Sequence, residues 1–356
     1  MFAMAAAILL AAALPISADA VSAQKAILVD GNTGRILYEK SAESQSLIAS
    51  TTKIMTALVI CEQCNVLDRM RIPKEAVGIE GSSMYLQEGE VLTLQDLLYG
   101  MMLHSGNDAA TALAIYCGGT VEGFAQLMND KAYSLGMTGS HFVNPHGLDA
   151  PEHYSTAKDL AILATEAMKN PIFASTVSTK TVSAGNRRLT NHNKLLWRVE
   201  GANGVKTGYT KAAGRILVSG AKRNGRQLIA VTIDAPNDWN DHATLLEQGF
   251  ERFTERQLVC KGDLLGILDV AWGTNEKVPL IASDDFSWAM AQGETTAIVL
   301  PGSGFVFAPI CEGQWAGDAH ILVDGQMVGT IELEYGSSAE LIREEKRSLW
   351  QRFMGG

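Results

Sequence analysis

The sequence predicts an α+β domain followed by a small all-β domain. Residues 26–38 and 204–234 read as strands with turn residues between them, and the segment separating the two regions carries several helical patterns. From about Thr254 onward, short apolar runs are punctuated by glycine, and Asp324-Gly325 is a hairpin signal. The order of strands, many helices, strands and a helix is not a regular βαβ alternation, so a parallel doubly wound sheet is not expected.

Length and charge limit the possible classes of protein. A chain of 356 residues has a prior of about two domains, and its formal net charge is −10. Binding to nucleic acid requires a basic face that neutralises phosphates, and this acidic chain has no long Lys/Arg block. We therefore expect no nucleic-acid partner. After the N-terminus no apolar run reaches the roughly 18 residues of a membrane span, which excludes a multi-span membrane protein.

The predicted elements of the first domain follow one another along residues 24–253. Two strands lie in 26–38, and a helix starts near Ser50. Loop and a short strand follow, and then come three helices and a turn-rich insert. The strand region at 204–234 turns at Asn224-Gly225, which is typical of a hairpin. The predicted ranges after the first helix are 72–93, 94–103, 107–117, 121–135, 183–196 and, for a closing helix, 242–253.

The N-terminal segment 1–23 is predicted to be a secretory signal. It is apolar, has the length of a signal peptide and offers small-x-small cleavage patterns that end at Ala20 and at Ala23. The usual basic residues at the start are missing. The alternative is a buried N-terminal helix, which would have to be covered on all sides because nearly all of its residues are apolar.

The C-terminal segment 338–356 is predicted to be an amphipathic helix that follows a β domain at 254–337. Its apolar residues lie among Arg and Lys at helical spacing. Such a helix packs on its own domain or lies on a membrane surface, where Trp350 and Arg352 would suit the interface. The sequence favours neither alternative.

Five cysteines form no evident framework of disulfides. Their number is odd, and Cys61-x-x-Cys64 lies on an apolar helical run without a second cysteine pair or a nearby histidine. We interpret Cys61 and Cys64 as buried thiols and assign the pair no function. The seven histidines form no H-E-x-x-H zinc motif, and no G-x-S-x-G nucleophile elbow is present.

The pattern S-x-x-K suits nucleophilic catalysis. A serine hydroxyl needs a nearby base, and a lysine three residues later on a helix lies on the same face. The pattern occurs at Ser22, Ser50 and Ser155. Ser22 lies in the cleavage region and Ser155 is most simply a helix cap. Lys53, three residues after Ser50, is followed by an almost wholly apolar helix that would place the pair in a low-dielectric cleft.

Two further motifs follow Ser50 in order. Ser105-Gly106-Asn107 is the only S-x-N in the chain, and Lys206-Thr207-Gly208 is the only K-T-G. The ordered set S-x-x-K, S-D-N and K-T-G is the signature of class A β-lactamases and penicillin-binding proteins, and here Gly106 stands in place of the aspartate of the second motif. The chain resembles the low-molecular-mass D-alanyl-D-alanine carboxypeptidases, serine peptidase family S11. The resemblance rests on residues 48–59, 81–114, 141–164 and 204–233, and the last domain resembles the C-terminal domain of that family.

The resemblance implies the penicillin-binding/β-lactamase-like transpeptidase fold, an antiparallel sheet flanked by helices with a helical lobe. It also implies that Ser50 attacks the penultimate D-Ala carbonyl and that Lys53 is the base. Ser105 and Lys206 would relay a proton to the leaving amine. The resemblance assigns substrate contacts to Asn107, Thr207, Gly208, Tyr209 and His146, and an oxyanion hole to the backbone N–H groups of Ser50 and Tyr209. A turn histidine bonded to backbone is the alternative for His146.

The implied substrate is the peptidoglycan stem pentapeptide, and the implied inhibitors are β-lactams. The resemblance implies no cofactor and no metal, and it places the enzyme outside the cytoplasm in the cell envelope, in wall or periplasm or peripherally on the membrane. A serine β-lactamase and a D,D-endopeptidase remain as alternatives with the same chemistry. A non-catalytic wall-peptide binder is the alternative from another class, and it would be expected to lose the nucleophile first.

Overall fold

A computed structural model describes residues 21–302 and 304–342. The chain divides into two compact units between Arg252 and Phe253. All the α-helices of the described residues belong to the first unit, and the second is built from strands. The predicted α+β class with a C-terminal all-β region is confirmed.

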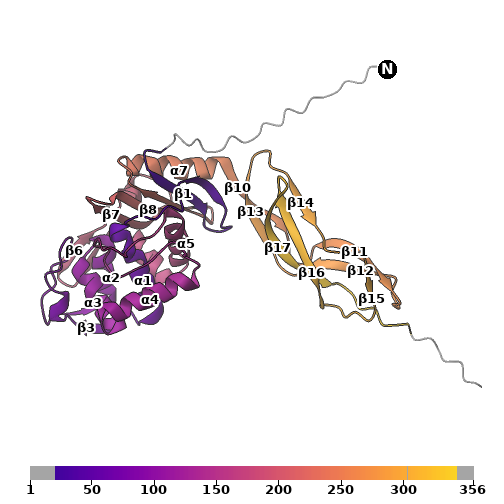
Figure 1. The fold of residues 1–356 in the computed structure, drawn as a ribbon, viewed down its shortest axis with the longest axis horizontal. Coiled ribbons are helices and arrows are strands. Elements are labelled where there is room, and N and C mark those ends of the chain that lie inside the picture. The colour runs from indigo at the N-terminus through magenta and orange to yellow at the C-terminus, as the bar shows by residue number, and fades with distance from the viewer. Residues whose placement is uncertain (1–20, 303, 343–356) are drawn as a thin grey trace, which may run out of the picture. The chain divides into compact units, whose positions relative to one another are not determined.

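A five-stranded antiparallel sheet forms the centre of the first unit, in the order β2-β1-β9-β8-β7. Helices α5 (Ala157–Ala167) and α7 (Asp238–Arg252) both contact β9, and Figure 1 shows α7 on one side of the sheet and α5 with the helical lobe on the other. Strand β9 is buried along almost its whole length because both its faces are covered. The strands are β1 (Lys25–Asp30), β2 (Ile36–Lys40), β7 (Ala202–Thr210), β8 (Gly214–Arg223) and β9 (Arg226–Ile233).

The predicted turn between β8 and β9 is present. Asn224 and Gly225 have φ of 50° and 86°, the left-handed conformation that a tight hairpin of this kind requires at both positions. Close to this turn, the side chain of Arg226 donates from Nε to Oδ2 of Asp30 at 2.5 Å. Asp30 is fully buried, so the first strand and β9 are joined by an ion pair in the interior.

The helical lobe packs around α1, whose first eight residues are all buried. Side-chain caps fix where several helices begin: Thr93 forms a capping box with Asp96 on α2, and Thr120 and Thr156 accept backbone N–H groups on α4 and α5. The helices are α1 (Lys53–Gln63), α2 (Leu94–Leu103), α3 (Asn107–Gly118), α4 (Val121–Ser134), α5 (Ala157–Ala167), α6 (Pro171–Ser178) and α7 (Asp238–Arg252).

Short elements connect the lobe to the sheet. The predicted turn-rich insert contains a hairpin of β5 (Thr181–Ala184) and β6 (Arg187–Thr190), and β3 (Arg69–Arg71) pairs with β4 (Val91–Thr93). The described part of this unit also contains the 3-10 turns η2 (Ala49–Thr52), η3 (Lys74–Ala76) and η4 (Lys194–Trp197). The helix expected near Ser50 therefore starts as a 3-10 turn, and its α-helical part begins only at Lys53.

The second unit contains a two-stranded and a six-stranded sheet, in the orders β10-β13 and β14-β16-β17-β12-β11-β15. The predicted Asp324-Gly325 turn joins β16 and β17. Fully buried Leu280, Ala319 and Leu333 belong to its core. The strands are β10 (Phe253–Val259), β11 (Leu264–Ala271), β12 (Lys277–Ala282), β13 (Phe286–Ala291), β14 (Thr296–Val299), β15 (Phe305–Phe307), β16 (Trp315–Val323) and β17 (Gln326–Tyr335).

The two predicted terminal segments are described only where they join the units. A helix starting at residue 338 was expected, but Ala339 and Leu341 form extended bridges with Ile310 and Gly273. Backbone pairing with these partners takes the place of a helical turn there, and residues 343–356 lie outside the described residues. Residues 1–20 of the predicted signal also lie outside the described residues. Within the described residues, no helix is both long and apolar enough to cross a bilayer.

Candidate active site

A cavity of about 390 Å³ opens between η2, the α2–α3 junction and strand β7. The chain brings together there residues that are up to 189 positions apart in the sequence, from Ser50 to Trp239. All three sequence motifs contribute to its wall. The lining residues are Ser50, Ser82, Ser105, His192, Lys194, Thr207, Gly208, Tyr209, Arg215, Ile216, Asp238 and Trp239.

Ser50 is presented by the 3-10 turn η2, which two threonines hold in place. The hydroxyl of Thr51 donates to the carbonyl of Ile48 at 2.5 Å. The hydroxyl of Thr52 lies 2.7 Å from Nε2 of His153. Because Nδ1 of His153 accepts the backbone N–H of Val143, Nε2 carries the proton and donates to Thr52. The turn is thus fixed from both sides, and Ser50 at its middle faces the cavity.

Lys53 begins α1, and its Nζ atom lies 3.0 Å from Oγ of Ser50. The same Nζ donates to Oδ1 of Asn107 at 2.6 Å and to the carbonyl of His146 at 2.7 Å. The side chain is fully buried. Burial, followed by the charge of Lys206, holds the pKa of Lys53 well below its ordinary value, and the carboxylate of Asp108 opposes this shift. A lysine in this state can accept a proton from the serine hydroxyl.

Ser105 lies in the junction between α2 and α3, with a left-handed φ of 62°. The next residue, Gly106, donates its N–H to the carbonyl of Gly100 and so turns the chain into α3. This junction places Ser105 in the wall of the cavity. It also places Asn107 against Lys53. The expected break between two helices is therefore what brings the S-x-N motif to Ser50 and Lys53.

The K-T-G motif lies on β7, as expected. Lys206 is buried and donates from Nζ to the carbonyl of Thr207 at 2.9 Å, and burial lowers its pKa to about 7. Thr207, Gly208 and Tyr209 line the cavity. A Cβ atom at Gly208 would lie 3.3 Å from the backbone nitrogen of Ser50, so the strand packs tightly against the turn that carries the serine. Glycine permits this close approach.

His146 contacts the site through its backbone rather than through its ring. Its carbonyl accepts from Lys53, while Nδ1 of the ring accepts the N–H of Leu148 at 3.2 Å. Burial and the neighbouring Lys53 lower the pKa of His146 to about 3, so the ring is neutral. The ring of His146 therefore bonds to the backbone of its own turn, as in the alternative of a turn histidine bonded to backbone.

Comparisons with known proteins show the family to which this chain belongs. The model of the Peptidase_S11 family, D-alanyl-D-alanine carboxypeptidase, matches residues 12–237. The chain belongs to this family. It is 32% identical to the D-alanyl-D-alanine carboxypeptidase DacF of Bacillus subtilis, over 86% of this chain and 83% of that protein. It is 33% identical to DacC of Escherichia coli, over 89% and 84%.

Solved structures give the same assignment. Penicillin-binding protein 5 of Haemophilus influenzae superimposes with a TM-score of 0.81 at 28% identity, covering 91% of this chain and 99% of that one. Penicillin-binding protein D2 of Listeria monocytogenes, solved in its ampicillin-bound form, matches with a TM-score of 0.59 at 30% identity, covering 65% and 98%. This member of the D-alanyl-D-alanine carboxypeptidases therefore has the penicillin-binding fold and is a serine hydrolase.

Several cavity residues of this carboxypeptidase were not among the sequence-based candidates. Ser82, His192, Lys194, Arg215, Asp238 and Trp239 line the cavity without belonging to a motif. His192 is one of these residues. Its ring lies 5.0 Å from that of His104, and burial followed by the charge of Lys206 lowers its pKa to about 4. No local pattern singled these residues out, because tertiary packing alone brings them to one cavity.

In residues 21–302 and 304–342, no group of three or more His, Cys, Asp or Glu side chains could hold a metal ion. Cys61 and Cys64 are half-buried and pack against the hydrophobic core. Burial raises the pKa of the Cys61 thiol to about 12. A thiol with so high a pKa is a poor nucleophile at neutral pH.

Proposed function

We propose that Ser50 is the nucleophile of a carboxypeptidase that removes the terminal D-alanine from peptidoglycan stem pentapeptides. The observation that carries this proposal is the 3.0 Å contact between Oγ of Ser50 and the buried amine of Lys53. A lysine with a lowered pKa is a competent base for a serine hydroxyl. The matched family is the other support.

In the proposed acylation, Lys53 takes the proton from Ser50 as Oγ bonds to the carbonyl carbon of the penultimate D-Ala. The backbone N–H groups of Ser50 and Tyr209 would stabilise the oxyanion, an effect typically worth about 2.7–4 kcal/mol per donor. The C–N bond to the last D-Ala then breaks. Ser105 and Lys206 would deliver a proton to the leaving amine. Water finally cleaves the ester and returns the hydroxyl to Ser50.

We propose that the residues of β7 bind the substrate terminus. Thr207 offers a hydroxyl to the terminal carboxylate, and Lys206 behind it supplies positive charge at short range. Gly208 and Tyr209 offer an exposed strand edge next to the nucleophile. Asn107 orients Lys53 and would present its amide to the peptide backbone. His146 supports Lys53 through its carbonyl in this scheme.

The test is release of D-alanine from a pentapeptide ending in D-Ala-D-Ala, run beside Ser50→Ala. Brief exposure to penicillin followed by mass spectrometry reports the acyl adduct. We expect a long-lived adduct on Ser50 and release of D-alanine, both absent in Ser50→Ala. Rapid loss of penicillin without D-alanine release would favour a β-lactamase instead. Cleavage of cross-linked dimers only would favour an endopeptidase, and the absence of any adduct would leave a binding protein.

We also propose that the chain is exported and cleaved after Ala20 rather than after Ala23. Residues 21–23 support this choice because they belong to the folded unit: Val21 and Ala23 are buried. Ser22 donates its N–H and its hydroxyl to Asp241 at 3.0 and 2.7 Å. Cutting after Ala23 would remove these contacts. Sequencing the N-terminus of the secreted protein tests the proposal, and a chain starting at Gln24 would contradict it.

A peripheral contact with the membrane surface is a further part of the proposal. Trp272, Phe305 and Phe307 form an exposed ring cluster, and the backbone of Ile342 donates to that of Trp272. The amphipathic sequence 343–356 follows directly. Exposed aromatic rings are suited to a lipid interface, and so is a basic sequence with apolar residues at helical spacing. Sedimentation with anionic vesicles should retain the full chain and lose a variant ending at Ile342, whereas equal retention of both would contradict a role of this tail.

A further inference from the structure

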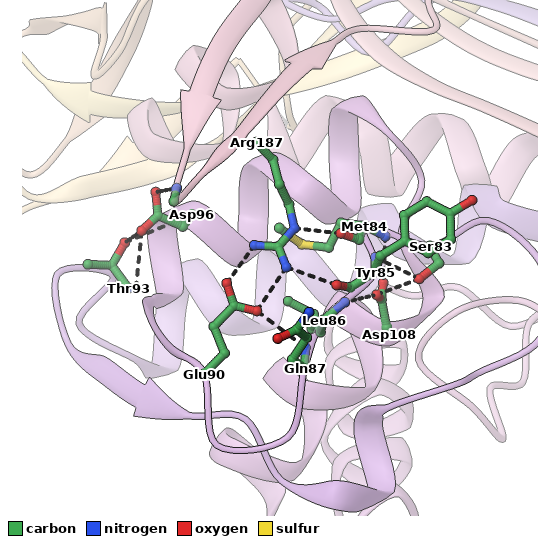
Figure 2. Close-up of polar contacts among 11 residues, drawn as sticks. Ser83, Met84, Tyr85, Leu86, Gln87, Glu90, Thr93, Asp96, Asp108 and Arg187 are labelled. Carbon is green, nitrogen blue, oxygen red and sulfur yellow. Dashed lines mark hydrogen bonds and ion pairs between the residues drawn. The ribbon is translucent and has the colours of Figure 1, made fainter.

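Arg187 lies outside the cavity and holds a segment of the active-site rim in place. The rim segment, residues 80–86, precedes β4 and contributes Ser82 to the cavity wall. Arg187 is the first residue of β6, and its guanidinium reaches across to this segment (Figure 2). Nε donates to the carbonyl of Met84 at 2.6 Å and Nη2 to that of Tyr85 at 2.9 Å.

A second pair of contacts aims the guanidinium at the rim segment. Glu90 accepts from Nη1 and Nη2 of Arg187 at 2.6 and 2.8 Å, a bidentate pair that fixes the plane of the fork. The hairpin that carries Arg187 is itself attached to α2, because Gly185 donates its N–H to Asp96. Glu90 and the hairpin that carries Arg187 therefore both lie outside the rim segment that Arg187 contacts.

Asp108 holds the same segment from the inside. Its carboxylate accepts the N–H groups of Met84 and Leu86, both at 3.0 Å, and the hydroxyl of Ser83 at 2.6 Å. The peptide groups around Met84 thus donate to an anion on one side and accept from a cation on the other (Figure 2). Tyr85 has a left-handed φ of 58°, a conformation that persists in a non-glycine residue when its surroundings determine it strongly.

The rim segment in turn orients Asn107. The carbonyl of Glu80 accepts from Nδ2 of Asn107 at 2.6 Å, and the carbonyl of Ser82 accepts its backbone N–H at 2.7 Å. These contacts leave Oδ1 of Asn107 directed at Lys53. A Cβ atom at Gly81 would lie 2.8 Å from Nδ2 of Asn107, so the segment packs directly on the amide.

We infer that Arg187 is a positioning residue for the acylation of Ser50. Its two contacts with the carbonyls of Met84 and Tyr85 keep the rim segment on Asn107, and Asn107 keeps Lys53 beside the nucleophile. Arg187 itself does not line the cavity, and its partner Glu90 does not either. The inference rests on the proposed role of Ser50, because the rate that it concerns is the acylation of this serine.

The decisive experiment separates these donor contacts from the ion pair. The variants are Arg187→Met, Arg187→Lys and the exchanged pair Arg187→Glu with Glu90→Arg. The exchanged pair keeps both charges, but a glutamate at position 187 cannot donate to the carbonyls of Met84 and Tyr85. The readouts are the second-order rate of penicillin acylation and the thermal midpoint, measured on the full chain. The matched control is Arg223→Met, which removes another forked contact, between Arg223 and Glu247.

We expect Arg187→Met to slow acylation about 10- to 100-fold, since small misplacements of catalytic groups have effects of this size. Arg187→Lys should recover part of the rate, because lysine donates but cannot reach all partners as a fork. Compared with Arg187→Met, the exchanged pair should recover thermal stability, but its acylation rate should stay low. Arg223→Met should lower the thermal midpoint and leave the rate unchanged.

Two results would overturn the inference while leaving the proposed function intact. One is an Arg187→Met protein that is folded and acylates at the rate of the unaltered chain. The other is an exchanged pair whose acylation rate recovers together with its stability. If Arg187→Met does not fold, Arg187→Lys and the exchanged pair decide between the same outcomes. Failure of the proposed function is recognised separately, because the unaltered chain would then form no adduct on Ser50.

Discussion

The Nζ atom of Lys53 lies 3.0 Å from Oγ of Ser50, inside a protein interior that disfavours the charged amine. This distance is within hydrogen-bond reach, which is the first requirement for a general base. The two residues come from different local structures, a 3-10 turn and the first turn of α1. The turn runs directly into the helix, so two residues three positions apart lie on one side of the chain and their side chains meet.

Replacement of the proposed base, Lys53, should abolish acylation without unfolding the chain. Lys53→Met keeps the length of a buried side chain and removes the amine, so we expect penicillin acylation to fall about 10²- to 10⁴-fold. The measurement is the rate of adduct formation by mass spectrometry. Lys158→Met is the matched control, since Lys158 also follows a serine by three residues but forms an exposed pair with Glu43. A comparable loss in both variants would contradict the assignment of the base.

The charge of Lys206 should set the pH at which acylation begins. Because this charge lowers the pKa of Lys53, its removal in Lys206→Met should raise that pKa. More of Lys53 is then protonated at a given pH, and the rising limb of the acylation profile should move to higher pH. The profile is measured as acylation rate against pH for the folded variant and for the unaltered chain. A limb that stays in place or moves to lower pH would refute the predicted coupling.

The buried histidine of α7 should make the first unit sensitive to acid. His242 is fully buried between Ser219 and Thr232, and burial lowers its pKa from 6.5 to about 3. Below pH 6.5 His242 is protonated in the unfolded chain, whereas in the folded chain it stays neutral down to about pH 3. Stability should therefore fall as pH drops from 6.5 towards 3, by about 1.4 kcal/mol per pH unit for this histidine.

His242→Gln should flatten this dependence by about that slope. Urea unfolding followed by helical circular dichroism reports the first unit, because it contains all the α-helices of the described residues. Both proteins are compared at pH 7.5, where the histidine is neutral in either state, and then between pH 6 and 4. Parallel curves for the two proteins would show that His242 does not carry the effect.

The buried ion pair between Asp30 and Arg226 should matter for stability and not for catalysis. Asp30→Asn removes the buried carboxylate to which Arg226 donates, and breaking a buried ion pair by removing one partner typically costs about 3–5 kcal/mol. Neither residue lines the cavity, so the acylation rate of the folded fraction should be unchanged. The control is Glu43→Gln, where an exposed pair is broken and no measurable loss of stability is expected. An equal effect of both substitutions in urea would contradict the prediction.

The sequence predicted most of the elements that carry the motifs. The break before Asn107 and the strand around Lys206 are both present, because glycine and the apolar pattern act locally. The start of the helix near Ser50 was less well predicted, since the 3-10 turn depends on His153 bonding to Thr52 from a distant loop. The extended path at Leu341 was missed for a similar reason, as its backbone partner lies at Gly273.

By itself, the sequence determined the family, the order of the three motifs and the identity of the nucleophile candidate with its lysine. These depend on which residue types follow one another, and such patterns survive without knowledge of the fold. Only the tertiary structure decided that Asn107 and the carbonyl of His146 bind Lys53, and that Arg187 reaches the rim segment. Burial, charge and hydrogen-bond geometry between distant segments exist only once the chain is packed, and these are the quantities that tune a base and position a nucleophile.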